Sequence, residues 1–232
     1  MADQRPPSGV VFESVGHAFG ERVVIRDVSL TLTERRIGIV GSNGSGKSTL
    51  ARMINGLVMP DHGSVWVNEI STRRRARDVR KLVGFVFTDP DRQIIMPTAA
   101  EDVELSLSRS GLKREERARR VHDTLARFGL AAHADHPAHR LSGGQKQLLA
   151  LASVLVTDPE VIVADEPTTL LDLRNSTMLR ETFATIDKQL IVVTHDLDLL
   201  TDFDRVVVID DGAVYADDQP AAAIAAYRGL MS

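Results

Sequence analysis

The strongest chemical signal in the sequence is a glycine-rich loop. Directly after the apolar segment Ile37–Val40, and before a helical pattern, the chain reads Gly41, Ser42, Asn43, Gly44, Ser45, Gly46, Lys47, Ser48 and Thr49. Glycines allow such a loop to turn its N–H groups inward around phosphate oxygens, and the N-terminus of the next helix adds a favourable dipole. Lys47 would then reach the β and γ phosphates, and Ser48 would offer its hydroxyl to Mg²⁺.

Two adjacent carboxylates end a second apolar segment. Val161–Asp165 has the composition of a buried strand, and Glu166 follows it directly. A parallel strand would deliver Asp165 beside the phosphate loop, where it can hold the magnesium shell. Glu166 would orient or deprotonate an attacking water. Without the phosphate loop, the same pair would indicate only two acids that end a strand.

A second glycine pair stands near the middle of the chain, in the run Leu141, Ser142, Gly143, Gly144 and Gln145. Ser142 is well placed as the N-cap of the helix that follows, so the run predicts another anion site at a helix N-terminus. One chain with a complete phosphate loop has no obvious use for two such cradles. A use exists if the second cradle serves the nucleotide of a neighbouring copy.

Composition and charge exclude several classes of protein. The chain has 232 residues, 43% of them hydrophobic and 26% charged, with a net charge of −4 and no cysteine. These values indicate a globular protein without disulfides, thiolate metal sites or a cysteine nucleophile. The two arginine-rich stretches, 73–81 and 113–120, lack interleaved aromatic residues, so we interpret them as solvated faces and expect no nucleic acid partner.

Membrane insertion is not expected. The N-terminus lacks the apolar core of a signal peptide, and the longest nearly apolar run, Leu148–Val156, is about half the roughly 20 residues of a spanning helix.

The expected elements alternate along most of the chain. Strands are predicted at Val10–Glu13, Ile37–Val40, Ser64–Val67, Leu82–Phe87, Val161–Asp165, Leu190–Thr194 and Arg205–Ile209, and helices at Lys47–Leu57, Lys113–Phe128, Gln145–Val156, Leu173–Ile186 and Ala221–Leu230. This order predicts an α/β fold with a largely parallel sheet. We expect one domain, with a sheet core at about 10–95 and 156–220 and an inserted helical subdomain at about 96–155.

His133, His136 and His139 repeat at a spacing of three, which raises the possibility of a metal site. Pro137 interrupts any helix that would align them, and Asp135 is the single carboxylate close in sequence. We therefore expect these histidines not to bind a metal.

The motifs GSNGSGKST, LSGGQ, VIVADEP, TTLLD and VVTHD occur in this order. Together they closely resemble the ATPase subunits of ATP-binding-cassette (ABC) transporters, over nearly the whole chain. The resemblance implies a phosphate-loop ATPase fold with an N-terminal antiparallel β subdomain, and ATP and Mg²⁺ as cofactors. Two subunits, here favoured as a homodimer, would pair head to tail. Each ATP would then lie between one phosphate loop and the segment Leu141–Gln145 of the other copy.

The same resemblance implies roles for three further residues. Phe19 occupies the position of the aromatic residue that stacks on adenine, although a core phenylalanine is the alternative. Asp172 would lie in the loop that crosses the dimer interface, and His195 would contact the γ-phosphate and the catalytic Glu166.

A polar elbow, Thr88–Gln93, follows the strand predicted at 82–87. In the ABC transporter family this segment joins the sheet to the helical subdomain. It carries a glutamine at the position of Thr88, and the side chain of that glutamine reaches the magnesium. The shorter Thr88 puts that contact in doubt. Gln93 supplies a second amide, in a DPDRQ setting that resembles the energy-coupling-factor (ECF) group of vitamin and metal-ion transporters.

The longer run DPDRQIIMPTAAEDVELSL resembles the ATPase subunit of biotin transporters in the ECF group. The resemblance implies a peripheral position at the cytoplasmic face of the cell membrane. The partners would be an integral-membrane coupling protein and a substrate-binding membrane protein. Cobalt or nickel uptake, an ABC ATPase not tied to a membrane, and an ATP-binding module without turnover are the alternatives. The presence of both Glu166 and His195 weakens the last.

Overall fold

The computed structural model describes residues 8–232 and separates them into two compact units. The first unit contains the chain up to Val83 together with Glu160–Asp165 and Asp187–Ser232, and the second contains Gly84–Pro159 and Glu166–Ile186. Residues 84–95 and 166–186 thus group with the helical segment rather than with the sheet.

The first unit contains a small antiparallel sheet with the strand order β2-β1-β4-β5. Its strands are β1 (Val10–Phe19), β2 (Arg22–Leu32), β4 (His62–Val67) and β5 (Ile70–Ser71). Strand β2 was not predicted, since Arg26 and Asp27 interrupt the alternation of apolar and polar residues. In the structure Asp27 has a positive φ of 46°. The tertiary sheet compensates, because Ile25, Val28, Leu30 and Leu32 are all buried.

Five strands of the larger sheet belong to the first unit, and they follow one another in the order β10-β9-β3-β8-β7. These strands are β3 (Arg36–Val40), β7 (Val161–Asp165), β8 (Gln189–Val193), β9 (Arg205–Asp210) and β10 (Ala213–Asp218). All neighbours are parallel except β10, which runs antiparallel to β9. Ile39 and Asp165 both pair with Val193, so the segments that follow β3, β7 and β8 leave the sheet at the same edge.

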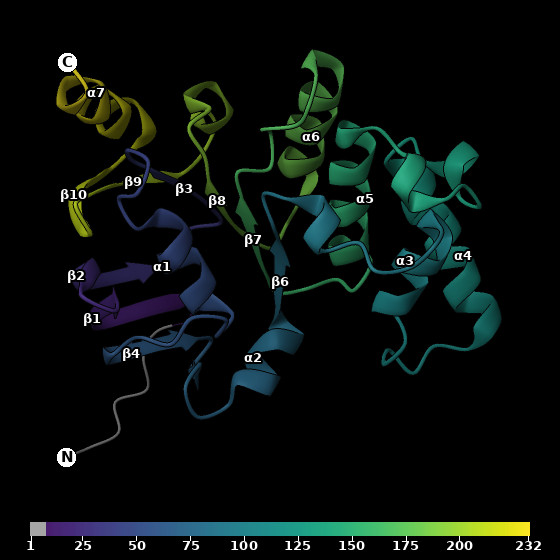
Figure 1. The fold of residues 1–232 in the computed structure, drawn as a ribbon, viewed down its shortest axis with the longest axis horizontal. Coiled ribbons are helices and arrows are strands. Elements are labelled where there is room, and N and C mark those ends of the chain that lie inside the picture. The colour runs from purple at the N-terminus through teal and green to yellow at the C-terminus, as the bar shows by residue number, and fades with distance from the viewer. Residues whose placement is uncertain (1–7) are drawn as a thin grey trace. The chain divides into compact units, whose positions relative to one another are not determined.

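The helices of the first unit are α1 (Lys47–Ile54), α2 (Ala76–Leu82) and α7 (Pro220–Leu230), with a short 3₁₀ turn η4 (Leu197–Leu200). Helix α7 packs against β9 and β10 (Figure 1). Helix α2 lies in the first arginine-rich stretch, where Asp78 forms ion pairs with Arg75 and Lys81 at the surface.

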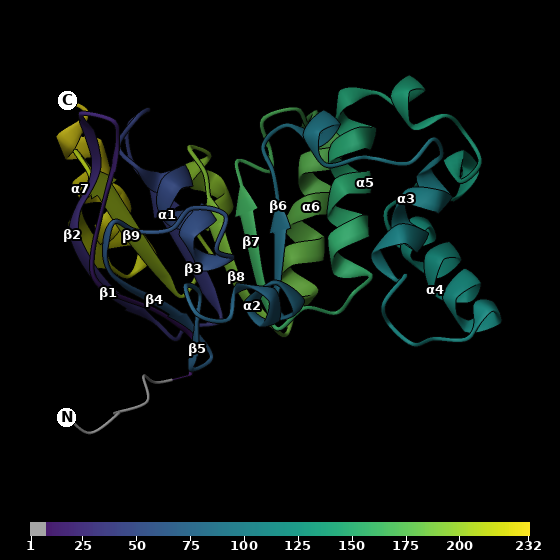
Figure 2. The same ribbon diagram turned by 60° about the horizontal axis from the view of Figure 1, so that its bottom comes forward.

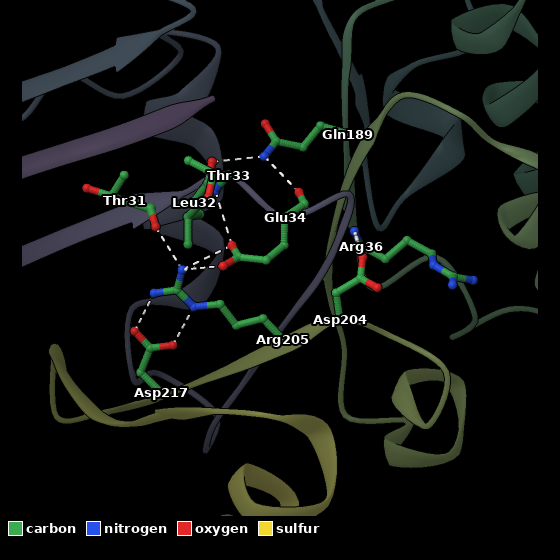
Figure 3. A network of polar contacts seen from close by, with 9 residues as sticks. All are labelled: Thr31, Leu32, Thr33, Glu34, Arg36, Gln189, Asp204, Arg205 and Asp217. Atoms are coloured by element: carbon green, nitrogen blue, oxygen red, sulfur yellow. Dashed lines mark hydrogen bonds and ion pairs between the residues drawn. The ribbon is translucent and has the colours of Figure 1, made fainter. Parts of the chain in front are cut away.

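A polar network holds together the sheet edge opposite the phosphate loop (Figure 3). The guanidinium of Arg205 on β9 donates to both carboxylate oxygens of Asp217 on β10, at 2.6 and 2.5 Å, and to Glu34 at 3.0 Å. Gln189 of β8 donates to the carbonyls of Leu32 and Glu34 at 2.9 and 3.0 Å. The turn between β2 and β3 is thereby tied to three strands of the larger sheet.

The second unit is mainly helical. The chain enters it through β6 (Val83–Val86), and its elements are η1 (Pro90–Arg92), α3 (Ala99–Ser106), α4 (Arg114–Arg127), η2 (Ala131–His133), η3 (Ala138–Arg140), α5 (Gly143–Leu155) and α6 (Leu173–Thr185). Helix α5 is its central element, since seven consecutive side chains from Leu148 to Val154 are buried. Figures 1 and 2 both show α6 alongside α5. Between residues 8 and 232 there is no helix with the length and apolar character needed to cross a membrane.

Candidate nucleotide site

The loop between β3 and α1 has a backbone that only glycine allows at its first and last turns. Gly41 has φ 153°, and a Cβ atom there would lie 2.0 Å from the carbonyl oxygen of Ile209. Gly46, the N-cap of α1, has φ 104°, and a Cβ atom there would lie 2.7 Å from the carbonyl oxygen of Val24. Strands β9 and β2 therefore hold the loop in a compact turn at the N-terminus of α1, as a phosphate cradle requires.

Lys47 begins α1 and folds back over this loop. Its ammonium group donates to the carbonyl oxygens of Gly41 and Ser42, both at 2.8 Å, and the side chain is largely buried. A buried ammonium that bonds to the rim of a glycine-rich loop places a fixed positive charge at the mouth of the cradle. The contact of Lys47 with phosphate stays a prediction.

Ser48 and Asp165 come together although 117 residues separate them. The hydroxyl of Ser48 donates to Oδ1 of Asp165 at 2.8 Å. Burial raises the pKa of the Asp165 carboxyl, while the bond from Ser48 and the charges of Arg52 and Lys47 oppose the shift. A hydroxyl and a carboxylate side by side are oxygen donors of the kind that Mg²⁺ prefers, so the two residues fit this ion.

Arg52 was not singled out in the sequence. Its Nη2 lies 3.5 Å from Oδ2 of Asp165, which is fully buried. Arg52 follows Ser48 by four residues on α1, so both side chains lie on one face of the helix and reach Asp165. Because it is a helix-face residue with no motif of its own, sequence reasoning gave no reason to select it.

Glu166 has an unusual backbone. It directly follows β7 and has φ 53°, a left-handed conformation that is strained for a glutamate. Such outliers concentrate at functional sites, because the surrounding structure must hold them in place. The extended backbone of β7 therefore ends at Asp165, and Glu166 has a different backbone conformation from its neighbour.

His195 follows β8 at the same edge of the larger sheet as the phosphate loop. The N–H of Thr194 donates to the carbonyl of Ile39 at 3.1 Å, which extends the pairing of β8 with β3 to the residue before His195. Asp196 then caps η4 through Leu199. The histidine is exposed at the turn between these two fixed points.

Phe19 ends β1 with 56% of its surface exposed. Its ring packs edge to face with that of His17, at a centroid distance of 4.6 Å. Asp61 fixes the same hairpin, since its carboxylate accepts from the N–H of Ala18 at 2.8 Å. This bond, together with nearby His17, holds the pKa of Asp61 below its usual value. An exposed, supported aromatic ring suits stacking better than core packing.

In the second unit, the segment Leu141–Gln145 forms a capping box at the start of α5. The N–H of Gln145 donates to Oγ of Ser142 at 3.2 Å, and the N–H of Ser142 donates to Oε1 of Gln145 at 2.9 Å. Gly143 and Gly144 form the first turn of the helix. The predicted N-cap at Ser142 is thus present, and the helix N-terminus is preorganised.

One histidine, His133, contacts this segment, and a second, His136, contacts His133. His133 Nε2 lies 3.1 Å from Nε2 of Gln145, and His133 Nδ1 lies 3.0 Å from Nδ1 of His136. Across residues 8–232 there is no group of three or more His, Cys, Asp or Glu side chains arranged to hold a metal ion. The sequence spacing of these histidines gave no signal for their contact with Gln145.

The elbow also belongs to the second unit. Two contacts attach it to α5, and a third attaches Phe87, the residue before the elbow, to the same helix. Gln93 accepts from the N–H of Phe87 at 3.1 Å and donates to the carbonyl of Ala150 at 3.1 Å. Lys146 forms an ion pair of 2.6 Å with Asp91. Gln147 donates to the carbonyl of Phe87 at 3.3 Å. The amide of Gln93 thus connects the elbow, which also contains Thr88, to the helix that begins at Ser142.

Asp172 is the N-cap of α6, since its carboxylate accepts from the N–H of Asn175 at 2.8 Å. The next residue, Leu173, is 85% exposed. Leu170, in the same segment, is 46% exposed as well. Neighbouring exposed apolar side chains can mark a surface that meets another chain.

The class of protein follows from the first unit. A glycine-rich loop leads from a parallel strand into a helix, and a neighbouring strand places Asp165 against Ser48. This arrangement defines a phosphate-loop nucleotide-binding protein.

Comparison with known proteins defines the family. The sequence model described as "ABC transporter" matches residues 25–169, which is more than half of the chain. The chain therefore belongs to the ABC transporter family, and it is an ABC ATPase. The predicted α/β fold with an antiparallel N-terminal sheet is confirmed.

Individual relatives agree with this assignment. The chain is 46% identical over 223 residues to the biotin transport ATP-binding protein BioM of Rhizobium etli, covering 96% of this chain and 99% of the relative. It is 39% identical to the energy-coupling factor transporter ATP-binding protein EcfA1 of Caldanaerobacter subterraneus. That alignment covers 85% of this chain and 74% of the relative. The dimeric structure of the ATP-binding cassette MJ0796 bound to ADP and Pi superimposes on this chain with a TM-score of 0.80. The two sequences are 31% identical, and the superposition covers 91% of this chain and 98% of the other.

Proposed function

We propose that this chain is the ATP-hydrolysing subunit of an ECF-type membrane importer whose substrate is biotin. The observation that carries the proposal is the presence of two separate glycine cradles, one before α1 and one before α5, in a chain similar to BioM and EcfA1. A cobalt or nickel importer of the same group is the alternative that the experiment below must separate.

ATP would bind to the first unit. The loop Gly41–Thr49 would surround the phosphates with backbone N–H groups, and Lys47 would neutralise the β and γ phosphates from the rim of the loop. Phe19 would stack on the adenine. Its exposure and its support by His17 favour this role.

Ser48 and Asp165 would hold Mg²⁺. Their contact of 2.8 Å and the burial of Asp165 support this assignment. The ion supplies charge neutralisation between the β and γ phosphates when it is bound.

Hydrolysis would depend on Glu166 and His195. Glu166 would accept the proton of the attacking water, and its left-handed backbone supports a distinct direction from Asp165. His195, exposed at the sheet edge where the loop begins, would contact the γ-phosphate and orient Glu166. The two side chains together would place the water in line with the bond that breaks.

A second copy of the chain would complete each site. Leu141, Ser142, Gly143, Gly144 and Gln145 form an anion cradle that the phosphate loop of the same chain does not need. The exposed Leu173 beside Asp172 supports a contact with another subunit in this region. We therefore propose a head-to-tail homodimer with two composite sites.

The membrane partners would be an integral-membrane coupling protein and a substrate-binding membrane protein, and the chain would lie peripherally at the cytoplasmic face. The elbow Thr88–Gln93 would carry the signal. Its contacts with α5 favour this role, because a movement at Ser142 would reach the elbow through Gln93 and Lys146.

Reconstitution with the membrane proteins tests this function. The chain would be co-expressed with the two candidate membrane proteins, purified as a complex and placed in lipid vesicles that contain ATP. Uptake of radiolabelled biotin would be compared with uptake of cobalt and nickel, with the Lys47→Ala chain as the control. ATP-dependent biotin uptake supports the proposal. Uptake of a metal ion alone assigns the alternative, and a chain that never assembles with membrane proteins overturns both.

A further inference from the structure

The hairpin that carries Phe19 also carries a cation. Strands β1 and β2 are joined by a tight turn, and Phe19 is paired in register with Arg22, the first residue of β2. Both side chains are exposed. The two residues therefore stand opposite one another at the open end of the small sheet.

Strand β2 runs directly along the phosphate loop. A Cβ atom on Gly46 would lie 2.6 Å from Cδ1 of Ile25 and 2.7 Å from the carbonyl oxygen of Val24. Two residues earlier on β2, Nη2 of Arg22 lies 3.2 Å from the position of a Cβ atom on Gly44. The guanidinium of Arg22 is thus in contact range of the exposed part of the loop.

The charge of Arg22 is not neutralised within the part of the chain that the structure describes. No carboxylate among residues 8–232 forms an ion pair or hydrogen bond with its side chain. On the same strand, by contrast, Arg26 pairs with Asp211 at 3.1 Å. The guanidinium has only hydrogen-bond donors, and the N–H groups of the loop are donors too, so the two cannot bond to each other. An anion is therefore the partner that suits this position.

We propose that Arg22 binds the phosphate chain of the nucleotide, as a second cation beside Lys47. The inference rests on the proposed nucleotide site. Phe19 would hold the base, the loop would hold the phosphates, and Arg22 would close the open side between them, since its strand partner is Phe19 and its guanidinium reaches Gly44. Its N–H donors can bind two phosphate oxygens at once, which the ammonium of a lysine cannot do with the same geometry.

The test is an equilibrium titration of the full chain with two ligands, ATP and inorganic tripolyphosphate, each with Mg²⁺. Arg22→Ala is expected to weaken binding of both ligands by about tenfold, the size of one exposed charge-assisted contact. Arg22→Lys should recover part of this loss. Arg26→Ala, which removes the same charge from the same strand, should bind both ligands as the wild type does. Phe19→Ala should weaken binding of ATP but not of tripolyphosphate.

Each outcome decides the question. Wild-type affinity of Arg22→Ala for both ligands overturns the inference, and so does an equal loss in Arg26→Ala, which would reflect net charge alone. The inference is also overturned if Arg22→Ala loses affinity only at protein concentrations where the chain dimerises. That result would assign Arg22 to a contact between two copies of the chain. If Lys47→Ala binds ATP as the wild type does, the proposed nucleotide site is wrong. If only the Lys47 variant is impaired, that site stands and Arg22 has no part in it.

Discussion

The neighbouring carboxylates Asp165 and Glu166 differ in the backbone conformation of their residues. Asp165 is the last residue of a buried strand and is held by Ser48, whereas Glu166 adopts a left-handed φ of 53° and leaves the strand direction. Strain of this kind costs about 1 to 3 kcal/mol and persists only where the surrounding structure imposes it. The conformation is therefore consistent with a residue whose direction matters for catalysis.

At the residue scale we predict that Glu166→Gln retains ATP binding but hydrolyses ATP about 10² to 10⁴ times more slowly, because an amide cannot accept the proton of the water. Steady-state phosphate release and nucleotide titration measure the two properties. Glu181→Gln, an exposed change on α6, is the control. Wild-type turnover of Glu166→Gln would show that Glu166 is not the general base.

Helix α5 joins two features that lie far apart in the sequence. Its N-terminus is the capped segment Ser142–Gln145, and its next turns hold the elbow through Lys146, Gln147 and the carbonyl of Ala150. A helix is stiff along its axis, so a displacement at one end is passed to the contacts of the following turns. The elbow and the capped segment are thus expected to move as one body.

We predict that Gln93→Ala lowers substrate uptake more than ATP hydrolysis, because it removes both bonds of the amide while the phosphate loop, Asp165 and Glu166 stay intact. Thr88→Gln, which introduces the residue usual in the family, should be tolerated. Uptake and ATPase rates of the reconstituted transporter measure the difference, with the exposed change Arg92→Ala as the control. Unchanged rates in Gln93→Ala together with a loss of uptake in Thr88→Gln would assign the coupling contact to Thr88 instead.

The sheet edge opposite the phosphate loop depends on one guanidinium. The hydrogen bonds that Arg205 donates to the carboxylates of Asp217 and Glu34 raise the pKa of its guanidinium, so the group stays charged. We predict that Arg205→Met lowers the free energy of unfolding by about 1.5 to 3 kcal/mol, since it leaves two carboxylates without their shared donor.

Thermal unfolding midpoints measure this effect. Arg205→Lys should restore little stability, because an ammonium cannot reproduce the two parallel bonds to Asp217. The exposed Arg228→Met change on α7 is the matched control. An Arg205→Met midpoint equal to that of the wild type would show that the network in Figure 3 contributes nothing to stability.

At the scale of the whole molecule, the proposed composite sites need two copies of the chain. Lys47→Ala would damage the loop half of a composite site, and Ser142→Arg would damage the other half. In a mixed dimer one site carries both changes and the other carries neither. We predict that an equal mixture of the two inactive chains recovers roughly a quarter of the wild-type ATPase rate, as random pairing of the chains implies.

The measurement is ATPase activity after the two chains have been mixed and allowed to exchange. Each variant alone at the same total concentration is the control. A mixture no more active than either variant, in a sample shown to contain mixed dimers, would contradict composite sites. Full activity per chain in a proven monomer would contradict them as well.

Local spacing in the sequence determined the parts of the site that depend on a few consecutive residues. Glycines at 41, 44 and 46 fit the positive φ angles of the loop, and a serine three residues before Gln145 fits a capping box. These features depend on backbone conformations that only certain residues adopt, so a short pattern is enough to predict them. The strands ending at Val40 and Asp165 were predicted from a different local signal, their short runs of apolar residues rich in Val and Ile.

Only the tertiary structure decided the contacts between distant segments. Strand register brings Ser48 to Asp165, chain folding brings His133 to Gln145, and strand β2, hidden in the sequence by Arg26 and Asp27, brings Arg22 to Gly44. Such contacts depend on which strands pair and in which register, and the free energy of that choice is spread over many buried side chains. No local sequence pattern predicts strand pairing and register. Arg22 and Arg52 therefore became candidate residues of the nucleotide site only in the folded protein.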